Sequence, residues 1–149
     1  MIAASTILDH TNNPADTITL DETARHRRRV KMVSDGGIEF LLDLPKAKLL
    51  RHGEGLVLDD GRVIEVVAAP EELFEVTARD AHHLLQLAWQ LGNRHLPAQI
   101  GAGSGSGTIR IRRDEVIRDM LLGLGADVKD ISGPFDPEGG AYDQRHSHD

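Results

Sequence analysis

The chain has 149 residues, of which 40% are hydrophobic and 3% aromatic, and its formal net charge is −7. This length suits one domain or two small ones of modest stability, with a core built from Leu, Ile, Val and Ala. The negative charge argues against nucleic acid or an anionic membrane as the main partner, and the lack of cysteine excludes disulfides and thiolate metal ligands.

The first ten residues lack the basic start and apolar run of a secretory signal, and no stretch reaches the roughly 20 apolar residues that span a bilayer. We therefore expect a cytoplasmic protein. The basic run at residues 25–29 is the one local exception to the acidic composition. It precedes a strand pattern and is interpreted as a solvated strand entrance, with a docking patch for an acidic partner as the alternative.

Residues 28–69 alternate short apolar runs with turn residues, which is typical of an all-β domain. Ser-Asp-Gly-Gly at residues 34–37 predicts a hairpin turn, and Pro45 is predicted to end the strand that follows it. The turn at residues 59–61 separates two further strands. These closely spaced strands predict a small β-sandwich or barrel.

Residues 68–72 form the junction to a second half that contains helices. Asp80 is a good N-cap for a helix over residues 81–91. A second helix is predicted over residues 114–124, and Gly125 ends it. The residues predicted to be buried on these helices are Leu84, Ala88 and Leu91 on the first, and Val116, Ile117, Met120, Leu121 and Leu124 on the second.

Strands predicted at residues 73–78, 98–100, 108–112 and 127–131 complete the order β-α-β-β-α-β, the ferredoxin-like arrangement. The segment at residues 101–107 lacks the Gly-Lys-Ser/Thr ending of a phosphate loop, so it is interpreted as a flexible hairpin connection. The predicted class is α+β. The predicted domains are residues 1–70 and residues 71–134, followed by a flexible tail at residues 135–149.

In a chain without cysteine, metal ligands must come from His, Asp or Glu. His95 follows the first helix between Gly92 and Pro97, so its imidazole is predicted to project from a fixed turn. A protonated histidine stabilised by the helix C-terminus is the alternative. His146 and His148 alternate near the end of the tail, where short His-rich tracts bind divalent metals weakly.

The other histidines are predicted to have no metal role. His82 and His83 are adjacent, so on a helix they point about 100° apart and are expected to face solvent. His10, His26 and His52 are isolated in the sequence. Because no Ser/His/Asp arrangement or pair of carboxylates stands out, we expect no enzymatic activity, and a metal-assisted hydrolase built around His95 is the alternative.

Three segments and the His-bearing C-terminus resemble the urease accessory protein E family, nickel metallochaperones that supply the urease active site. The segments are Leu-Gly-Asn-Arg-His-Leu-Pro at residues 91–97, the helix through residues 119–126, and Pro-Phe-Asp-Pro-Glu-Gly-Gly-Ala-Tyr at residues 134–142. The resemblance covers nearly the whole chain. It implies that Ni(II) is bound as cargo, and Zn(II) or Cu(II) can occupy the same site.

The resemblance also implies a homodimer with a partner-binding N-terminal domain and a ferredoxin-like metal-binding domain. His95 then lies at the two-fold interface, where both protomers offer it to one ion, and His146 or His148 completes the coordination. The implied partners are the urease apoprotein and its accessory proteins, including the maturation GTPase.

Two features depart from the family pattern. The tail carries fewer histidines than in many relatives, so we expect it to store fewer ions. Many relatives also have an Asp-His pair where the second helix begins, whereas this chain has Asp114 and Glu115. An auxiliary site there is expected to be weakened or absent. The alternative function is an assembly module of the urease maturation complex with incidental metal binding.

Overall fold

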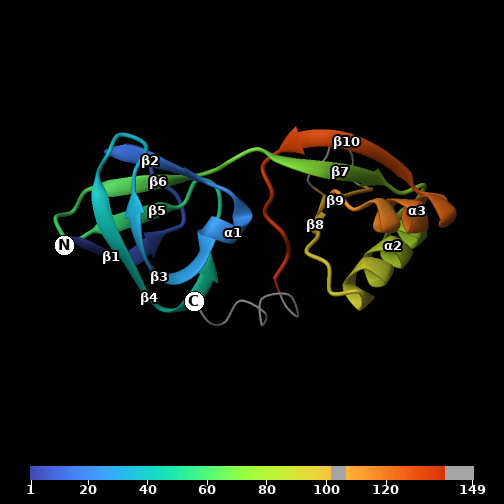
Figure 1. The fold of residues 1–149 in the computed structure, drawn as a ribbon, viewed down its shortest axis with the longest axis horizontal. Helices are drawn as coiled ribbons and strands as arrows, with labels where there is room; N and C mark the ends of the chain where they lie inside the picture. The colour runs from blue at the N-terminus through green and yellow to red at the C-terminus, as the bar shows by residue number, and fades with distance from the viewer. Residues whose placement is uncertain (102–106, 140–149) are drawn as a thin grey trace. The chain divides into compact units, whose positions relative to one another are not determined.

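The structure is a computed structural model that describes residues 1–101 and 107–139 (Figure 1). The chain divides into two compact units, the first spanning Met1–Ala69 and the second beginning at Pro70. The division falls inside the junction at residues 68–72, where the sequence pattern changes. No helix in the described ranges has both the length and the apolar character needed to cross a membrane.

The first unit is a six-stranded sheet with one short helix. Its elements are β1 (Ala3–Leu8), β2 (Asp16–Leu20), α1 (Glu22–Arg25), β3 (His26–Val33), β4 (Glu39–Leu49), β5 (Gly55–Leu58) and β6 (Val63–Ala68). The strands lie in the order β2-β6-β5-β1-β4-β3. Alternate residues of these strands are buried, and they pack into one core that includes Phe40, Leu42, Leu56 and Ile64.

The sheet curls so that its edge strand β2 meets the turn that follows the other edge strand, β3. The Thr17 and Thr19 hydroxyls of β2 donate to the carboxylate of Asp35 at 2.7 and 2.8 Å. Asp16 in turn accepts from the backbone N–H of Gly36 at 2.8 Å, and a Cβ at Gly36 would lie 2.6 Å from that carboxylate. The predicted hairpin turn is therefore present, and its glycine is needed for a close approach between the two edges.

Pro45 does not end its strand as predicted, because β4 continues through it to Leu49. The β3–β4 ladder pairs Arg27 with Lys48 and Arg29 with Asp43, so residues 44–47 lie opposite Arg28 alone. A bulge of this kind leaves backbone groups outside the ladder, which suits a residue without an N–H. The strand therefore continues through a bulge that accommodates Pro45.

The second unit is a four-stranded antiparallel sheet with two helices on one face (Figure 1). Its elements are β7 (Glu71–Thr77), α2 (Ala81–Asn93), β8 (Gln99–Ile100), β9 (Thr108–Arg112), α3 (Glu115–Gly123) and β10 (Asp127–Gly133). They follow one another in the order β-α-β-β-α-β, and the strands lie in the order β10-β7-β9-β8. Phe74 and Val76 of β7 pack at the centre of its core.

The prediction for the buried face of α3 was partly wrong. Ile117 and Leu121 are buried as expected, but Val116 is 72% exposed and Leu124 is also exposed. Ile117 and Leu121 lie one turn apart on the face that packs on the core, whereas Val116 points about 100° around the helix from Ile117, and Leu124 is the C-cap. The buried face of this nine-residue helix is therefore narrower than predicted.

Asp35→Asn should lower the free energy of unfolding at neutral pH and lose this effect in acid. Hydrogen bonds from Thr17 and Thr19 hold the pKa of Asp35 below its ordinary value of 3.8. A carboxyl whose pKa is lower in the folded state stabilises the fold above its unfolded pKa, and this contribution disappears as the pH falls through the folded pKa. Urea unfolding between pH 7 and pH 2.5 measures the difference between variant and wild type.

Asp9→Asn, which changes an exposed carboxylate outside this contact, is the matched control and should leave the pH profile unchanged. If the free energy of unfolding of Asp35→Asn stays below that of wild type by the same amount down to pH 2.5, the ionised carboxylate of Asp35 is not the source of the stabilisation.

Candidate metal site

His95 lies in the turn that ends α2, directly after the C-cap residue Arg94. Its backbone N–H donates to the Gly92 carbonyl at 3.0 Å, and the N–H of Leu96 donates to the Leu91 carbonyl at 3.2 Å. These two bonds form a Schellman motif, which places the residue after the C-cap in the left-handed region. His95 accordingly has a φ of 57°.

Helix α3 ends in the same motif with a glycine. Gly125 donates to the Leu122 carbonyl at 3.0 Å, Ala126 donates to the Leu121 carbonyl at 3.0 Å, and Gly125 has a φ of 84°. Glycine adopts this conformation freely, whereas a residue with a Cβ pays about 1 kcal/mol or more. Within residues 1–101 and 107–139, His95 is the only non-glycine residue with a positive φ. Such strain collects at functional sites, so this histidine is a functional candidate.

The turn that carries His95 is fixed on both sides. Leu96 packs against the core of the second unit, and Pro97 restricts the backbone that follows. The His95 residue itself is exposed. An exposed imidazole on a fixed backbone can meet a ligand without reorganising the helix that holds it.

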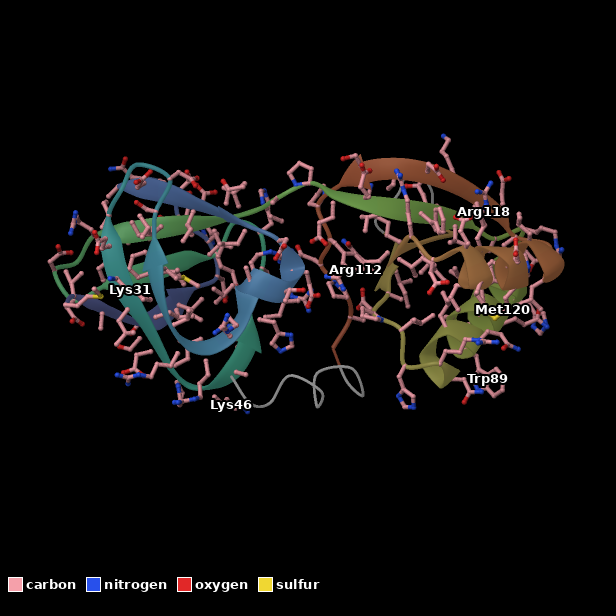
Figure 2. The ribbon with its side chains drawn as sticks, viewed as in Figure 1. Lys31, Lys46, Trp89, Arg112, Arg118 and Met120 are labelled. Atoms are coloured by element: carbon pink, nitrogen blue, oxygen red, sulfur yellow. The ribbon has the colours of Figure 1, made fainter. Side chains whose placement is uncertain are left out.

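The exposed face of α2 is apolar. Leu85 and Trp89, one helical turn apart, are 69% and 65% exposed, and Figure 2 shows Trp89 on the outer side of the helix. Together with His82 and Leu124 they line a cavity of about 460 Å³. The next turn of the same face leads to residues 92–93 and then to His95. Sequence reasoning missed this face, although the apolar character of Leu85 and Trp89 outside the predicted stripe was a usable signal.

The predicted exposure of His83 was wrong, since this side chain is 2% exposed. Its Nδ1 accepts from the Arg79 backbone N–H at 3.0 Å, and its Nε2–H therefore donates to the Leu124 carbonyl at 2.8 Å. A buried polar ring is stable when both nitrogens are hydrogen-bonded. His83 joins the start of α2 to the end of α3 and has no nitrogen left for a metal. His82 is exposed, as predicted.

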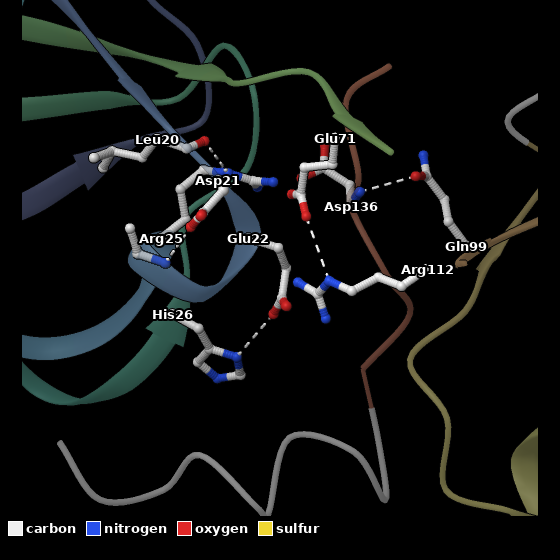
Figure 3. Close-up of polar contacts among 10 residues, drawn as sticks. Leu20, Asp21, Glu22, Arg25, His26, Glu71, Gln99, Arg112 and Asp136 are labelled. Carbon is white, nitrogen blue, oxygen red and sulfur yellow. Dashed lines mark hydrogen bonds and ion pairs between the residues drawn. The ribbon is translucent and has the colours of Figure 1, made fainter. Parts of the chain in front are cut away.

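Two histidines of the first unit, His26 and His52, have polar partners within that unit. His26 is buried, with its Nδ1 3.7 Å from the Glu22 carboxylate (Figure 3). His52 Nδ1 accepts from the Ala68 backbone N–H at 3.1 Å. In the described ranges no three His, Asp or Glu side chains gather as a metal-binding group.

The segment that follows β10 runs along β8. Asp136 donates its N–H to the Gln99 side chain at 2.8 Å (Figure 3). Glu138 donates its N–H to the Ala98 carbonyl at 2.8 Å, and its carboxylate accepts from the Ile100 N–H at 3.2 Å. These contacts hold the end of the described chain against the strand that follows the His95 turn.

Gly139, the last described residue, lines a cavity of about 150 Å³ together with Gly92 and Leu96, which flank His95 in sequence. His146 and His148 lie outside the described residues. They are seven and nine residues beyond Gly139, and seven residues span at most about 24 Å. The covalent distance therefore permits a tail histidine to reach His95.

His95→Gly should stabilise the metal-free protein by about 1 kcal/mol, because glycine removes the cost of a Cβ in the left-handed region. Urea unfolding at one fixed protein concentration, with a chelator present, measures the change. Gly125→Ala is the matched control at the end of α3 and should destabilise, because alanine would introduce a Cβ at a φ of 84°. A His95→Gly protein less stable than wild type would contradict the strain at this turn.

Both halves of the chain match domains of known proteins. Residues 2–69 match the N-terminal domain of the UreE urease accessory protein, and residues 71–149 match its C-terminal domain. A urease accessory protein UreE from a Chelativorans species is 66% identical over 149 residues, covering 100% of this chain and 91% of the relative.

Proteins of the same name from Rhodopseudomonas palustris and a Bradyrhizobium species are 58% and 59% identical, over 92% and 90% of this chain. The chain spans 62% of the length of each of these two relatives. With both domain models matched and this level of identity, the chain belongs to the UreE urease accessory protein family.

Proposed function

We propose that this protein is a nickel metallochaperone that binds Ni(II) at a homodimer interface and delivers it for assembly of the urease active site. Membership of a urease accessory protein family supports urease maturation as the process. The observation that carries the choice of site is His95, an exposed histidine held in the left-handed turn that ends α2.

The exposed face of α2 supports a dimer that buries this helix. Leu85 and Trp89 expose apolar area that a second copy would remove from water, at roughly 25 cal/mol per Å². A two-fold axis repeats every group of the interface, and in the proposed dimer the axis passes close to His95, so that each His95 would face His95 of the partner subunit. The order of strands and helices in the second unit supports its assignment to the ferredoxin-like arrangement.

Imidazole is a good ligand for Ni(II), and also for Zn(II) and Cu(II), so the two His95 rings would hold an ion without selecting it strongly. A histidine of the tail, His146 or His148, would add a third ligand with a high effective concentration because it is tethered. Withdrawal of that ligand opens a coordination position for transfer of the ion. Glu115 is exposed at the start of α3 and 3.8 Å from Arg118, so it is a weak candidate for an auxiliary ligand.

The remaining parts of the proposal follow from this role. The protein would act in the cytoplasm, where it would meet the urease apoprotein and its accessory proteins, including the maturation GTPase. It would transfer an ion and catalyse no reaction of its own.

His95→Ala should abolish tight nickel binding while the dimer persists, because the lost ligands lie at the interface but contribute little apolar area. Calorimetric titration with Ni(II), combined with size measurement by light scattering, should give about one tight ion per dimer in wild type and none in the variant. His82→Ala is the matched control, since it removes an exposed histidine from the same helix and should bind nickel normally.

Unchanged tight binding in His95→Ala would exclude the proposed site. Urease activation separates the metallochaperone from an assembly module with incidental metal binding. A metallochaperone that lacks His95 fails to activate urease when nickel is scarce, whereas an assembly module without His95 still activates it under those conditions.

Truncation after Tyr142 should weaken nickel affinity or lower the stoichiometry and leave the dimer intact, because it removes both tail histidines and none of α2. The same titration measures this effect. A variant with His146 and His148 both changed to Ala, but of full length, separates the loss of ligands from the loss of chain. Identical titrations for all three proteins would show that the tail supplies no ligand.

A further inference from the structure

The chain after β10 crosses the second sheet from one edge to the other, and we call residues 134–139 the crossing segment. β10 lies at one edge of this sheet and β8 at the opposite edge. β10 ends at Gly133, and the backbone N–H of Glu138 already donates to the carbonyl of Ala98, directly before β8, at 2.8 Å. The crossing segment therefore spans the full width of the sheet.

The crossing segment lies on the face of the sheet opposite the two helices. Core residues of β9 alternate with Arg110 and Arg112, whose side chains therefore point to that face. Arg110 Nη1 donates to the Pro134 carbonyl at 3.3 Å, and the Arg112 guanidinium lies 5.1 Å from the centre of the Phe135 ring. Because Phe135 is also buried, it anchors the first half of the segment.

Glu138 fastens the second half to the open edge of β8. Within the described chain β8 pairs with β9 alone, so its other edge presents backbone groups that no strand covers. Glu138 pairs with two of them, since its N–H donates to Ala98 and its carboxylate accepts from the N–H of Ile100 at 3.2 Å. The N–H of Asp136 adds a third contact through the side chain of Gln99 (Figure 3).

The crossing segment ends beside the turn that carries His95. Its last residue, Gly139, lines a cavity of about 150 Å³ together with Gly92 of α2. The chain therefore passes round the edge of β8, from the face that holds Phe135 to the face that holds the helices. Glu138 makes its contacts at this passage, so it determines where the chain beyond the segment begins.

We propose that Gln99 and Glu138 are positioning residues for the tail ligand of the metal site. They fix the crossing segment to β8, so that the chain beyond Gly139 starts beside His95 and its histidines have a high effective concentration there. This inference rests on the function proposed above and assigns a role to two residues that hold no ion themselves.

The length of the tether sets the expected size of the effect. His146 lies seven residues beyond Gly139 and eleven residues beyond Phe135. The effective concentration of a tethered group falls with about the −3/2 power of the tether length. Release of the segment from β8 back to Phe135 should therefore lower it about twofold, and further because the longer tether must also round the edge of the sheet.

A spin label tests the position of the tail without a metal. The chain has no cysteine, so Ser147→Cys provides a single attachment site for a nitroxide. In the metal-free, full-length protein the label should broaden the amide resonances of residues 92–96. In Gln99→Ala/Glu138→Pro this broadening should fall about twofold or more, because proline removes the N–H and the carboxylate of Glu138 together.

Glu138→Gln is the conservative control, because its amide oxygen still accepts from the N–H of Ile100, and it should give the broadening of the wild type. Asp130→Ala, which removes an exposed carboxylate on β10 away from the segment, is the second control. Circular dichroism verifies the fold of each variant. Broadening that is unchanged in Gln99→Ala/Glu138→Pro would overturn the proposal.

Nickel affinity, measured by competition with a chelator, supplies a readout that a purely structural role would not move. Gln99→Ala/Glu138→Pro should bind Ni(II) about twofold or more weakly than wild type. The same two changes should cause no further loss in a protein that already carries His146→Ala/His148→Ala. A loss of equal size in both backgrounds would mean that Gln99 and Glu138 act on the His95 turn itself, which would also overturn the proposal.

The two readouts keep this inference separate from the function on which it rests. If His146→Ala/His148→Ala binds Ni(II) as tightly as wild type, the tail supplies no ligand and the proposed function loses that part. The spin label still measures whether Gln99 and Glu138 hold the tail beside His95, because that experiment contains no nickel.

Discussion

The backbone turn at the end of α2 is the constraint on which the candidate metal site depends. The carbonyl of Leu91, a core residue, accepts from both Arg94 and Leu96, and Leu96 returns to the same core. Between these two residues the backbone of His95 is held at a positive φ. The helix, the core and the backbone position of His95 are therefore coupled, and this backbone cannot move without loss of the bonds that end the helix.

A carrier site gains from this arrangement. In the proposed dimer, the backbones of the two His95 residues would need no ordering when an ion arrives, so less entropy would be lost at that step. In the same proposal, a third ligand from the ten residues beyond Gly139 could leave without disturbing the other two. Fixed and removable ligands in one site make it possible to combine capture with release, whereas a closed four-ligand site would favour retention.

The order of strands and helices in the second unit could be predicted from sequence because apolar spacing, N-caps and glycine stops report directly on local structure. The conformation of His95 could not be predicted from sequence, because a Schellman motif is usually recognised by a glycine after the C-cap, as at Gly125, and here that position holds a histidine. The prediction that Pro45 ends its strand was wrong for a related reason. Proline interrupts a regular ladder but is tolerated in a bulge, and this bulge depends on the pairing of Arg28 and its neighbours in β3. The burial of His83 depends on the Leu124 carbonyl, 41 residues away in sequence.

The histidines show why placement decides chemistry more than number does. His83 and His52 use ring nitrogens on backbone groups, which stabilises the junctions between elements and removes those nitrogens from metal chemistry. His26 is buried in the first unit, with its Nδ1 3.7 Å from the Glu22 carboxylate, so its ring is largely shielded from solvent. His95 differs from these three histidines because it is exposed, on a turn that the end of α2 fixes. A histidine therefore becomes a candidate ligand through the element that carries it and the surface that it faces, and the residue type alone gives neither.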